Sequence, residues 1–268
     1  MNEIFAQWYK DRPGKKTLRE WNPSIIPAII ERHPKCPDDK YSFIHRLIAG
    51  DMGYGKTSLA YLLMAKLDYT INGYTKLDEE ENSYIFALNN IIYHPDELFS
   101  RMDKQLDIGL PDWIWTLDDC SIHMGKQLYR QNRKAYDMLE DNLPTIREYV
   151  TCLLVTTPRV NNLAKPFRDF FDKKIKITLE EGGITQWTRR GKHYFKEYYP
   201  DDIHYVIYHP YDDKYSCLVP QPYYGMLRKK KLDALKEYRR TKKHLTLKEQ
   251  DEIEKEEDEI TEDIENEE

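Results

Sequence analysis

The sequence has few cysteines and no long apolar run. Cys36, Cys120, Cys152 and Cys217 are far apart in 268 residues and form no C-x-x-C pair. A disulfide framework or a cysteine metal site is therefore unsupported, and we interpret these residues as buried or incidental thiols. No stretch of about 18 apolar residues occurs, so we expect no membrane span. The first residues also lack the apolar core of a secretion signal, which favours a cytoplasmic protein, in the host cell if the chain is viral.

The charge is unevenly distributed along the chain. The net charge is −6, and residues Glu249–Glu268 contribute −12, so the preceding 248 residues carry +6. Most of this positive charge lies in Arg228–Lys243, which has a net charge of +7. The acidic end is too charged to bury, so we expect it to be disordered. It could fold back on the basic segment, recruit a partner protein or serve only solubility.

Glycine is also scarce, yet three of the 11 glycines fall within nine consecutive positions. These positions read G-x-x-x-x-G-K-T-S, the pattern of a phosphate-binding loop. An apolar stretch that predicts a strand, Tyr41–Ala49, precedes them, and leucines at helical spacing follow them. The loop therefore has the strand and helix that it needs. We predict that its nine residues bind nucleotide: Gly50, Asp51, Met52, Gly53, Tyr54, Gly55, Lys56, Thr57 and Ser58.

The residue types of this loop suit a triphosphate. Glycines allow positive φ angles and let the backbone approach a ligand closely. The backbone N–H groups and the helix N-terminus then converge on an anion. Lys56 would reach the β- and γ-phosphates, and the Thr57 hydroxyl would bind Mg²⁺. The predicted cofactors are therefore ATP and Mg²⁺.

A second stretch adds two carboxylates. Trp113–Leu117 predicts a short apolar strand that ends at Asp118 and Asp119. In P-loop ATPases the first such acid holds the Mg²⁺ shell, and the second can orient or deprotonate the attacking water. We therefore expect Asp118 to be the metal residue and Asp119 the base. By itself, an acid pair at a strand end is also an ordinary turn signal.

A third strand, Val150–Thr157, ends in hydroxyl residues. Thr156 or Thr157 could sense the γ-phosphate, or either could satisfy the local turn backbone. One short helix later, Arg168 could project into the nucleotide of a neighbouring subunit and stabilise transition-state charge, which would require a homo-oligomer. Arg159 is a competitor for this role, and either arginine could instead make a surface ion pair.

The remaining segments give weaker signals. Ser83–Leu88 fits a strand or the start of a helix, and aromatic residues interleave with cations in Arg189–Lys196, as in a nucleic-acid surface or an ordinary small sheet. We further expect helices at Ser24–Arg32, from His94, at Gly125–Leu143 and at Leu227–Lys243, and strands at Lys174–Leu179, Trp187–Phe195, Tyr205–Tyr208 and Tyr215–Val219.

Together these patterns predict an α/β fold: a three-layer P-loop NTPase core with a mainly parallel sheet, a small C-terminal β appendage and a basic helix. The expected domains are an N-terminal arm (1–40), the ATPase core (41–180), the β-rich appendage (181–226), the basic helix (227–246) and a disordered acidic tail (247–268).

The chain resembles the small P-loop ATPases of crenarchaeal viruses and plasmids, of the additional-strand type described as AAA-like or DnaA-like. The resemblance covers about Tyr41 to Arg240 and rests on four segments: GDMGYGKTSLA, IWTLDDCSIHMGK, LLVTTPRVNNLAKPFR and DKYSCLVPQPYYGMLRKKKLDAL. It implies an additional-strand fold, ATP hydrolysis and a role in replication, loading or packaging of the element's own DNA. The chain departs from this pattern in having no evident helical lid after Leu179 and an Asp-Asp pair in place of Asp-Glu.

Two functions therefore stand as hypotheses. The first is an oligomeric, DNA-associated ATPase. The second is a nucleotide switch or loader that hydrolyses ATP slowly and recruits a partner protein. A small-molecule kinase would need an acceptor site and a cationic lid, and the sequence identifies neither.

Overall fold

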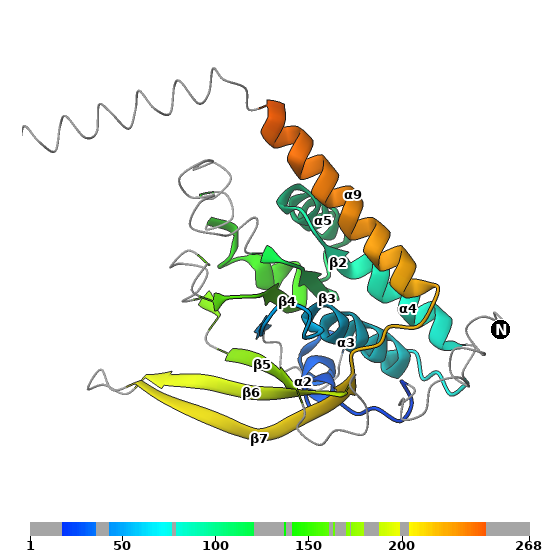
Figure 1. The fold of residues 1–268 in the computed structure, drawn as a ribbon, viewed down its shortest axis with the longest axis vertical. Helices are drawn as coiled ribbons and strands as arrows, with labels where there is room; N and C mark the ends of the chain where they lie inside the picture. Colours follow the sequence, from blue (N-terminus) through cyan, green and yellow to red (C-terminus); the bar gives the residue numbers. More distant parts are fainter. Residues whose placement is uncertain are drawn as a thin grey trace, which may run out of the picture. The chain divides into compact units, whose positions relative to one another are not determined.

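The chain folds around a mixed sheet of seven strands. Figure 1 shows this sheet and its helices in the computed structural model. Helices pack on this sheet, so the predicted α/β class is confirmed. Within the described part of the chain, every helix is too short or too polar to cross a bilayer. The described residues are 18–35, 43–76, 79–120, 137, 141–160, 163, 170–171, 173–179, 188–198 and 204–244.

The strand order is β2-β3-β4-β1-β5-β6-β7. The first five of these strands run parallel and the last two are antiparallel additions. Because β4 lies between β1 and β3, the strand that ends in threonines separates the strand before the glycine loop from the strand before the acid pair. The strands are β1 (Ile44–Ala49), β2 (Ile91–Ile92), β3 (Asp112–Leu117), β4 (Val150–Thr157), β5 (Lys173–Leu179), β6 (Thr188–Tyr198) and β7 (His204–Ser216).

The helices have clear local start and stop signals. In α5 the His94 side chain accepts a hydrogen bond from the Asp96 N–H, Pro95 occupies the first turn, and Gly109 ends the helix in the left-handed conformation. Ser83–Leu88, which the sequence left open, belongs to a helix. The helices are α2 (Ile25–Arg32), α3 (Lys56–Ile71), α4 (Glu80–Asn90), α5 (Pro95–Ile108), the 3₁₀ turn η3 (Ile146–Glu148) and α9 (Tyr223–His244).

The two faces of the parallel strands are covered differently. Helix α3 packs on one face, where the Thr116 hydroxyl contacts the Met64 sulfur at 3.3 Å. On the other face, Leu98 and Met102 of α5 join the buried side chains of alternate strand positions. That apolar cluster includes Leu47, Trp115, Leu117, Leu153 and Val155. Burial on both faces explains why these strands read as continuous apolar runs.

The β-rich region differs from the expected set of three short strands. Strands β6 and β7 are long, and β7 spans Tyr205–Tyr208 and reaches Ser216, so it includes only the first two residues of the last strand expected at Tyr215–Val219. They form an antiparallel extension of the core sheet through β5. The domain boundaries given above stay a prediction.

The chain divides into two compact units, residues 1–225 and 226–268. The basic run lies in α9, which begins four residues earlier than expected. The helix expected at Gly125–Leu143 falls almost entirely outside the described residues, as does the acidic end of the chain.

Candidate nucleotide-binding site

The glycine loop joins the end of β1 to the start of α3, and its backbone is tightly confined. Gly50, Gly53 and Gly55 have φ angles of 156°, 81° and 84°. A Cβ on Gly50 would lie 3.0 Å from the Ile177 carbonyl oxygen, and one on Gly55 would lie 2.6 Å from the Cys217 Cβ. The loop thus needs glycine both for its conformation and for its close approach to neighbouring chain.

Lys56 begins α3 and folds back over this loop. Its Nζ donates hydrogen bonds to the carbonyl oxygens of Gly50 and Asp51, each at 2.9 Å. Helix α3 starts directly behind the loop, where the Leu59 N–H donates to the Gly55 oxygen at 2.9 Å. A fixed positive charge and the N-terminus of a helix therefore meet at one place, an arrangement that binds phosphate.

Asp118 lies at the centre of the polar contacts beside the loop. Its Oδ1 accepts a 2.8 Å hydrogen bond from the Thr57 hydroxyl and a 2.6 Å hydrogen bond from the Thr156 hydroxyl. Asp118 and Thr156 are each only 1% exposed. Three elements, α3, β3 and β4, thus bring one carboxylate and two hydroxyls together. The parallel strands make this possible because their carboxyl ends meet at one edge of the sheet.

Asp119 follows in an unusual backbone conformation. Its φ is +55°, which is uncommon for a residue with a side chain. Its N–H donates to the Thr156 hydroxyl at 2.8 Å. Thr156 therefore fixes both members of the acid pair, through a donated and an accepted hydrogen bond. Strained backbone of this kind is typical of functional sites.

The two candidate sensor threonines occupy different surroundings. The Thr156 hydroxyl lies among the site residues, whereas the Thr157 hydroxyl donates to the Arg159 carbonyl oxygen at 3.1 Å. Thr157 thus satisfies the local turn. Of the two candidate arginines, Arg159 is exposed, and Arg168 lies outside the described residues.

The remaining loop residues are less enclosed. Asp51 and Met52 are exposed, and 83% of the Met52 surface is accessible. Tyr54 and Ser58 are half-buried. The structure therefore brings Lys56, Thr57, Asp118, Asp119 and Thr156 into one site and leaves the tip of the loop open to ligand.

The donor set fits Mg²⁺ better than a transition metal. The described residues contain no group of three or more His, Cys, Asp or Glu side chains that could hold a metal ion. Mg²⁺ does not need one, since it keeps several waters and takes one or two protein oxygens together with phosphate oxygens. Thr57 and Asp118 would supply those protein oxygens.

Other residues of the site have no sequence signal. The Tyr215 hydroxyl donates to the Gly55 carbonyl oxygen at 3.1 Å, across a separation of 160 residues. The Cys217 Cβ lies 2.6 Å from the place that a Cβ on Gly55 would take, and burial raises the pKa of the Cys217 thiol. The end of β7 therefore supports the loop from the side. No short-range pattern could have indicated this contact.

The aromatic residues of the N-terminal arm could, from the sequence, either stack on adenine or anchor the arm. Trp21 is 6% exposed, and its ring centroid lies 6.4 Å from that of Tyr215. For Trp21 the structure thus shows burial beside the end of β7. Trp8 and Tyr9 lie outside the described residues.

Comparisons with known proteins give only distant similarity. No family model matches the chain, and no curated protein matches it. Among solved structures, an ATPase domain shares 9% identity at a TM-score of 0.36, covering 62% of this chain and 80% of that domain. The N-terminal domain of zonular occludens toxin from Neisseria meningitidis shares 14% sequence identity at a TM-score of 0.36, and the match covers 62% of this chain and 93% of that domain. A KaiC-like protein from Pyrococcus horikoshii shares 14% sequence identity at a TM-score of 0.34, and the match covers 71% of this chain and 99% of that protein.

Proposed function

We propose that this protein binds and hydrolyses ATP with Mg²⁺. The observation that carries the proposal is the hydrogen bond between Thr57 and Asp118, which joins two residues 61 positions apart beside a phosphate-binding loop. A hydroxyl from the loop helix and a carboxylate at the end of another core strand are the protein groups that hold Mg²⁺ in P-loop ATPases.

Each residue of the site has a distinct task in this proposal. The loop N–H groups and Lys56 bind the phosphates, and Thr57 and Asp118 hold Mg²⁺, whose charge offsets the negative charge on the phosphate oxygens. Asp119 orients or deprotonates the attacking water. Thr156 holds the Asp118 carboxylate and the backbone of Asp119. Arg168 would complete the site of a neighbouring subunit in a homo-oligomer.

Phosphate release tests this proposal. Lys56→Ala should reduce ATP turnover by at least roughly 100-fold, because it removes a charge that faces the phosphates. Lys76→Ala is the matched control, since Lys76 is exposed and lies beyond the end of α3. Equal turnover of Lys56→Ala and the wild type would end the proposal. A product carrying the phosphoryl group, in place of free phosphate, would instead indicate a kinase.

We further propose that DNA is the partner of this ATPase. A cationic face, defined as Lys176, Arg190, Lys192 and Lys214, supports this. Lys176 of β5 stands directly opposite Lys192 of β6 in the register. In the register of β6 and β7, Arg190 is paired with Lys214 and Lys192 with Asp212. Like charges directly opposite one another, such as Lys176 and Lys192, destabilise a sheet, and the phosphates of a bound polyanion would offset this repulsion.

Helix α9 offers a second basic surface, and charge reversal separates the two. Lys176→Glu with Lys192→Glu should weaken DNA binding and lower its dependence on salt concentration, because each lost phosphate contact lowers the log–log slope by about 0.7–0.9. The double variant Lys229→Glu with Lys236→Glu tests whether α9 binds DNA, and Lys104→Glu, at an exposed lysine of α5, is the control. Unchanged DNA binding in the first variant, with loss in the second, would place the DNA surface on α9.

The resemblance to ATPases of crenarchaeal viruses and plasmids supports a role in replication or packaging of such an element's DNA. Mass measurement with a non-hydrolysable ATP analogue tests the homo-oligomer, and a monomer under these conditions would exclude an arginine contributed in trans. ATPase activity with and without single- and double-stranded DNA tests the DNA dependence.

One observation favours the slower nucleotide switch as a second candidate. The base candidate is an aspartate, which is shorter than the glutamate of the family pattern, and its backbone is held in a left-handed conformation. The switch would bind ATP with normal affinity, turn it over slowly even with DNA, and recruit a partner protein through the acidic end of the chain. Deletion of residues 247–268 would then abolish partner binding without changing ATP affinity.

A further inference from the structure

Tyr93 lies beside the metal-binding carboxylate on the side opposite Thr156. Ile92 of β2 is paired with Leu117 of β3, and the Asp118 N–H donates to the Ile92 carbonyl oxygen at 2.9 Å. Leu117 is in turn paired with Val155 of β4. The next residues along the chain are Tyr93, Asp118 and Thr156, so these three lie side by side at the ends of the paired segments. Asp118 thus lies between Tyr93, which directly follows β2, and Thr156 of β4.

The Tyr93 hydroxyl is buried without a partner among the described residues. The residue is 5% exposed, and its hydroxyl has no hydrogen-bond partner within the ranges that the structure describes. Buried hydroxyls are nearly always hydrogen-bonded, so an orphan next to a candidate site calls for an explanation. Tyr61 on α3 shows the usual situation, because its hydroxyl donates to the Tyr84 carbonyl oxygen at 2.6 Å.

Negative charges surround the Tyr93 side chain. Burial raises the pKa of its phenol, and the negative charges of Asp118, Glu97 and Asp119 raise this pKa further. The Tyr93 side chain therefore lies within electrostatic reach of both carboxylates of the acid pair.

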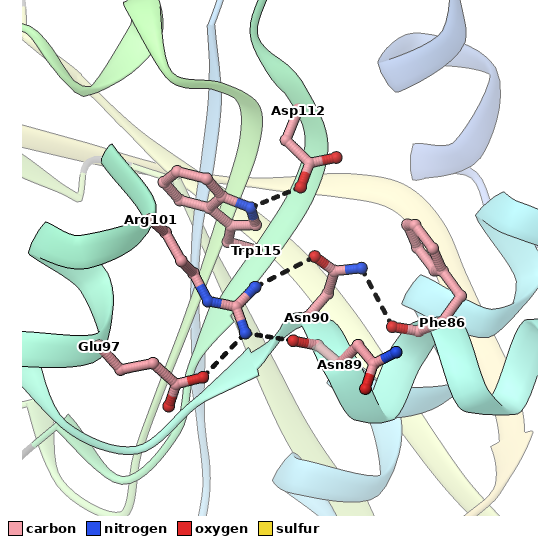
Figure 2. A network of polar contacts seen from close by, with 7 residues as sticks. All are labelled: Phe86, Asn89, Asn90, Glu97, Arg101, Asp112 and Trp115. Atoms are coloured by element: carbon pink, nitrogen blue, oxygen red, sulfur yellow. Dashed lines mark hydrogen bonds and ion pairs between the residues drawn. The ribbon is translucent and has the colours of Figure 1, made fainter. Parts of the chain in front are cut away.

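A polar network holds the segment that carries Tyr93. Figure 2 shows the Arg101 side chain of α5 pointing at the end of α4, where it contacts the Asn89 carbonyl oxygen and, at 3.3 Å, the Asn90 Oδ1. Arg101 also pairs with Glu97 at 2.8 Å, and Asn90 donates to the Phe86 carbonyl oxygen at 3.0 Å. These contacts join the helices that flank β2, so the position of Tyr93 is fixed from both sides.

We propose that Tyr93 is a positioning residue of the ATPase site, whose hydroxyl donates to a water molecule held by Asp118 or Asp119 when nucleotide binds. The inference rests on the proposed ATP hydrolysis. The hydroxyl adds nothing to the nucleotide-free fold and acts only in the nucleotide complex, where it orients that water through a hydrogen bond.

Tyr93→Phe and Tyr61→Phe form a matched pair, since each removes one buried hydroxyl. In nucleotide-free protein, Tyr93→Phe should leave Tm unchanged or raise it, whereas Tyr61→Phe should lower Tm by about 2–4 °C through loss of a satisfied hydrogen bond. In ATP turnover, Tyr93→Phe should lower kcat by about 10-fold and raise KM, because the hydrogen bond already forms in the ground-state nucleotide complex. The Tm increase caused by Mg²⁺ with a non-hydrolysable ATP analogue should be smaller in Tyr93→Phe than in the wild type.

A Tm loss in nucleotide-free Tyr93→Phe as large as that of Tyr61→Phe would show a structural partner and overturn the inference. The inference would also be overturned if Lys56→Ala lowered ATP turnover but Tyr93→Phe left kcat unchanged. Absence of any wild-type turnover would instead reject the proposed hydrolysis. In that case the Tm increase with Mg²⁺ and the analogue is the remaining test of Tyr93. An equal increase in Tyr93→Phe and the wild type would overturn the inference.

Discussion

The Thr57 hydroxyl donates a 2.8 Å hydrogen bond to the Asp118 carboxylate, so the first turn of α3 is joined to the end of β3. This contact defines the centre of the candidate site. The other residues are arranged around it, with Lys56 next in sequence to Thr57, Asp119 next to Asp118, and Thr156 bound to both acids.

Asp118→Asn should separate metal binding from folding. The amide oxygen still accepts hydrogen bonds from Thr57 and Thr156, so we expect Tm to stay within a few degrees of the wild type, about 2–4 °C. Loss of the negative charge should reduce Mg²⁺-dependent turnover by roughly 100-fold or more. Phosphate release over a Mg²⁺ titration measures this. Wild-type turnover at low Mg²⁺ would show that Asp118 is not the metal residue.

Thr156→Val and Thr157→Val distinguish the two adjacent threonines. Thr156→Val removes both the hydroxyl that donates to Asp118 and the acceptor of the Asp119 N–H, so we expect turnover to fall by roughly 10–100-fold. Thr157→Val removes only the bond to the Arg159 carbonyl oxygen and should cost about 1 kcal/mol of stability with little change in turnover. The reverse result in kcat measurements would assign the sensor to Thr157.

Gly55→Ala should abolish nucleotide binding. The new Cβ would lie 2.6 Å from the Cys217 Cβ, and the φ of 84° is unfavourable for alanine. Gly109→Ala is the matched control, because Gly109 has a φ of 69° and nothing within 4 Å of an added Cβ. Gly109→Ala should therefore lower the free energy of unfolding by about 1–2 kcal/mol through backbone strain and leave the affinity for ATP unchanged. Calorimetric titration with ATP measures both, and tight binding by Gly55→Ala would show that the loop can move away from β7.

His33 should make stability depend on pH. It is 2% exposed, its Nε2 lies 3.0 Å from the Pro111 carbonyl oxygen, and its Nδ1 accepts from the Lys35 N–H at 3.1 Å. Its ring also stacks on Trp113 at a centroid distance of 3.5 Å. Burial lowers the pKa of this imidazole below its usual 6.5, an effect that outweighs the opposing hydrogen bond to Pro111.

The folded protein therefore binds fewer protons at His33 than the unfolded chain does just below pH 6.5. This contribution to stability is complete above pH 6.5 and is lost as the pH falls through the folded-state pKa. His33→Phe keeps an aromatic ring but loses both hydrogen bonds, so its free energy of unfolding should be about 1–2 kcal/mol lower than that of the wild type at neutral pH. This free energy should then fall less between neutral and acidic pH than it does in the wild type. Urea unfolding at about pH 7.5 and about pH 5 measures this. An equal decline in both proteins would assign the acid sensitivity to other groups.

The sequence alone determined the parts of the site that depend on neighbouring residues. The glycine spacing of Gly50–Gly55, followed by Lys56 and Thr57, specifies a loop and a helix start through local backbone geometry. The apolar runs before Asp118 and Thr156 predict strands that are buried on both faces. Ser83–Leu88 could not be decided in this way, because a short apolar run fits either a helix or a strand until its packing partners are known.

Only the tertiary structure decided which of these pieces meet. The order that inserts β4 between β1 and β3 brings Thr156, and not Thr157, against Asp118, because alternate strand residues point to opposite faces and that choice depends on register. The same holds for Tyr215 against Gly55 and for Tyr93 beside Asp118, where long-range strand pairing creates contacts that no local pattern encodes.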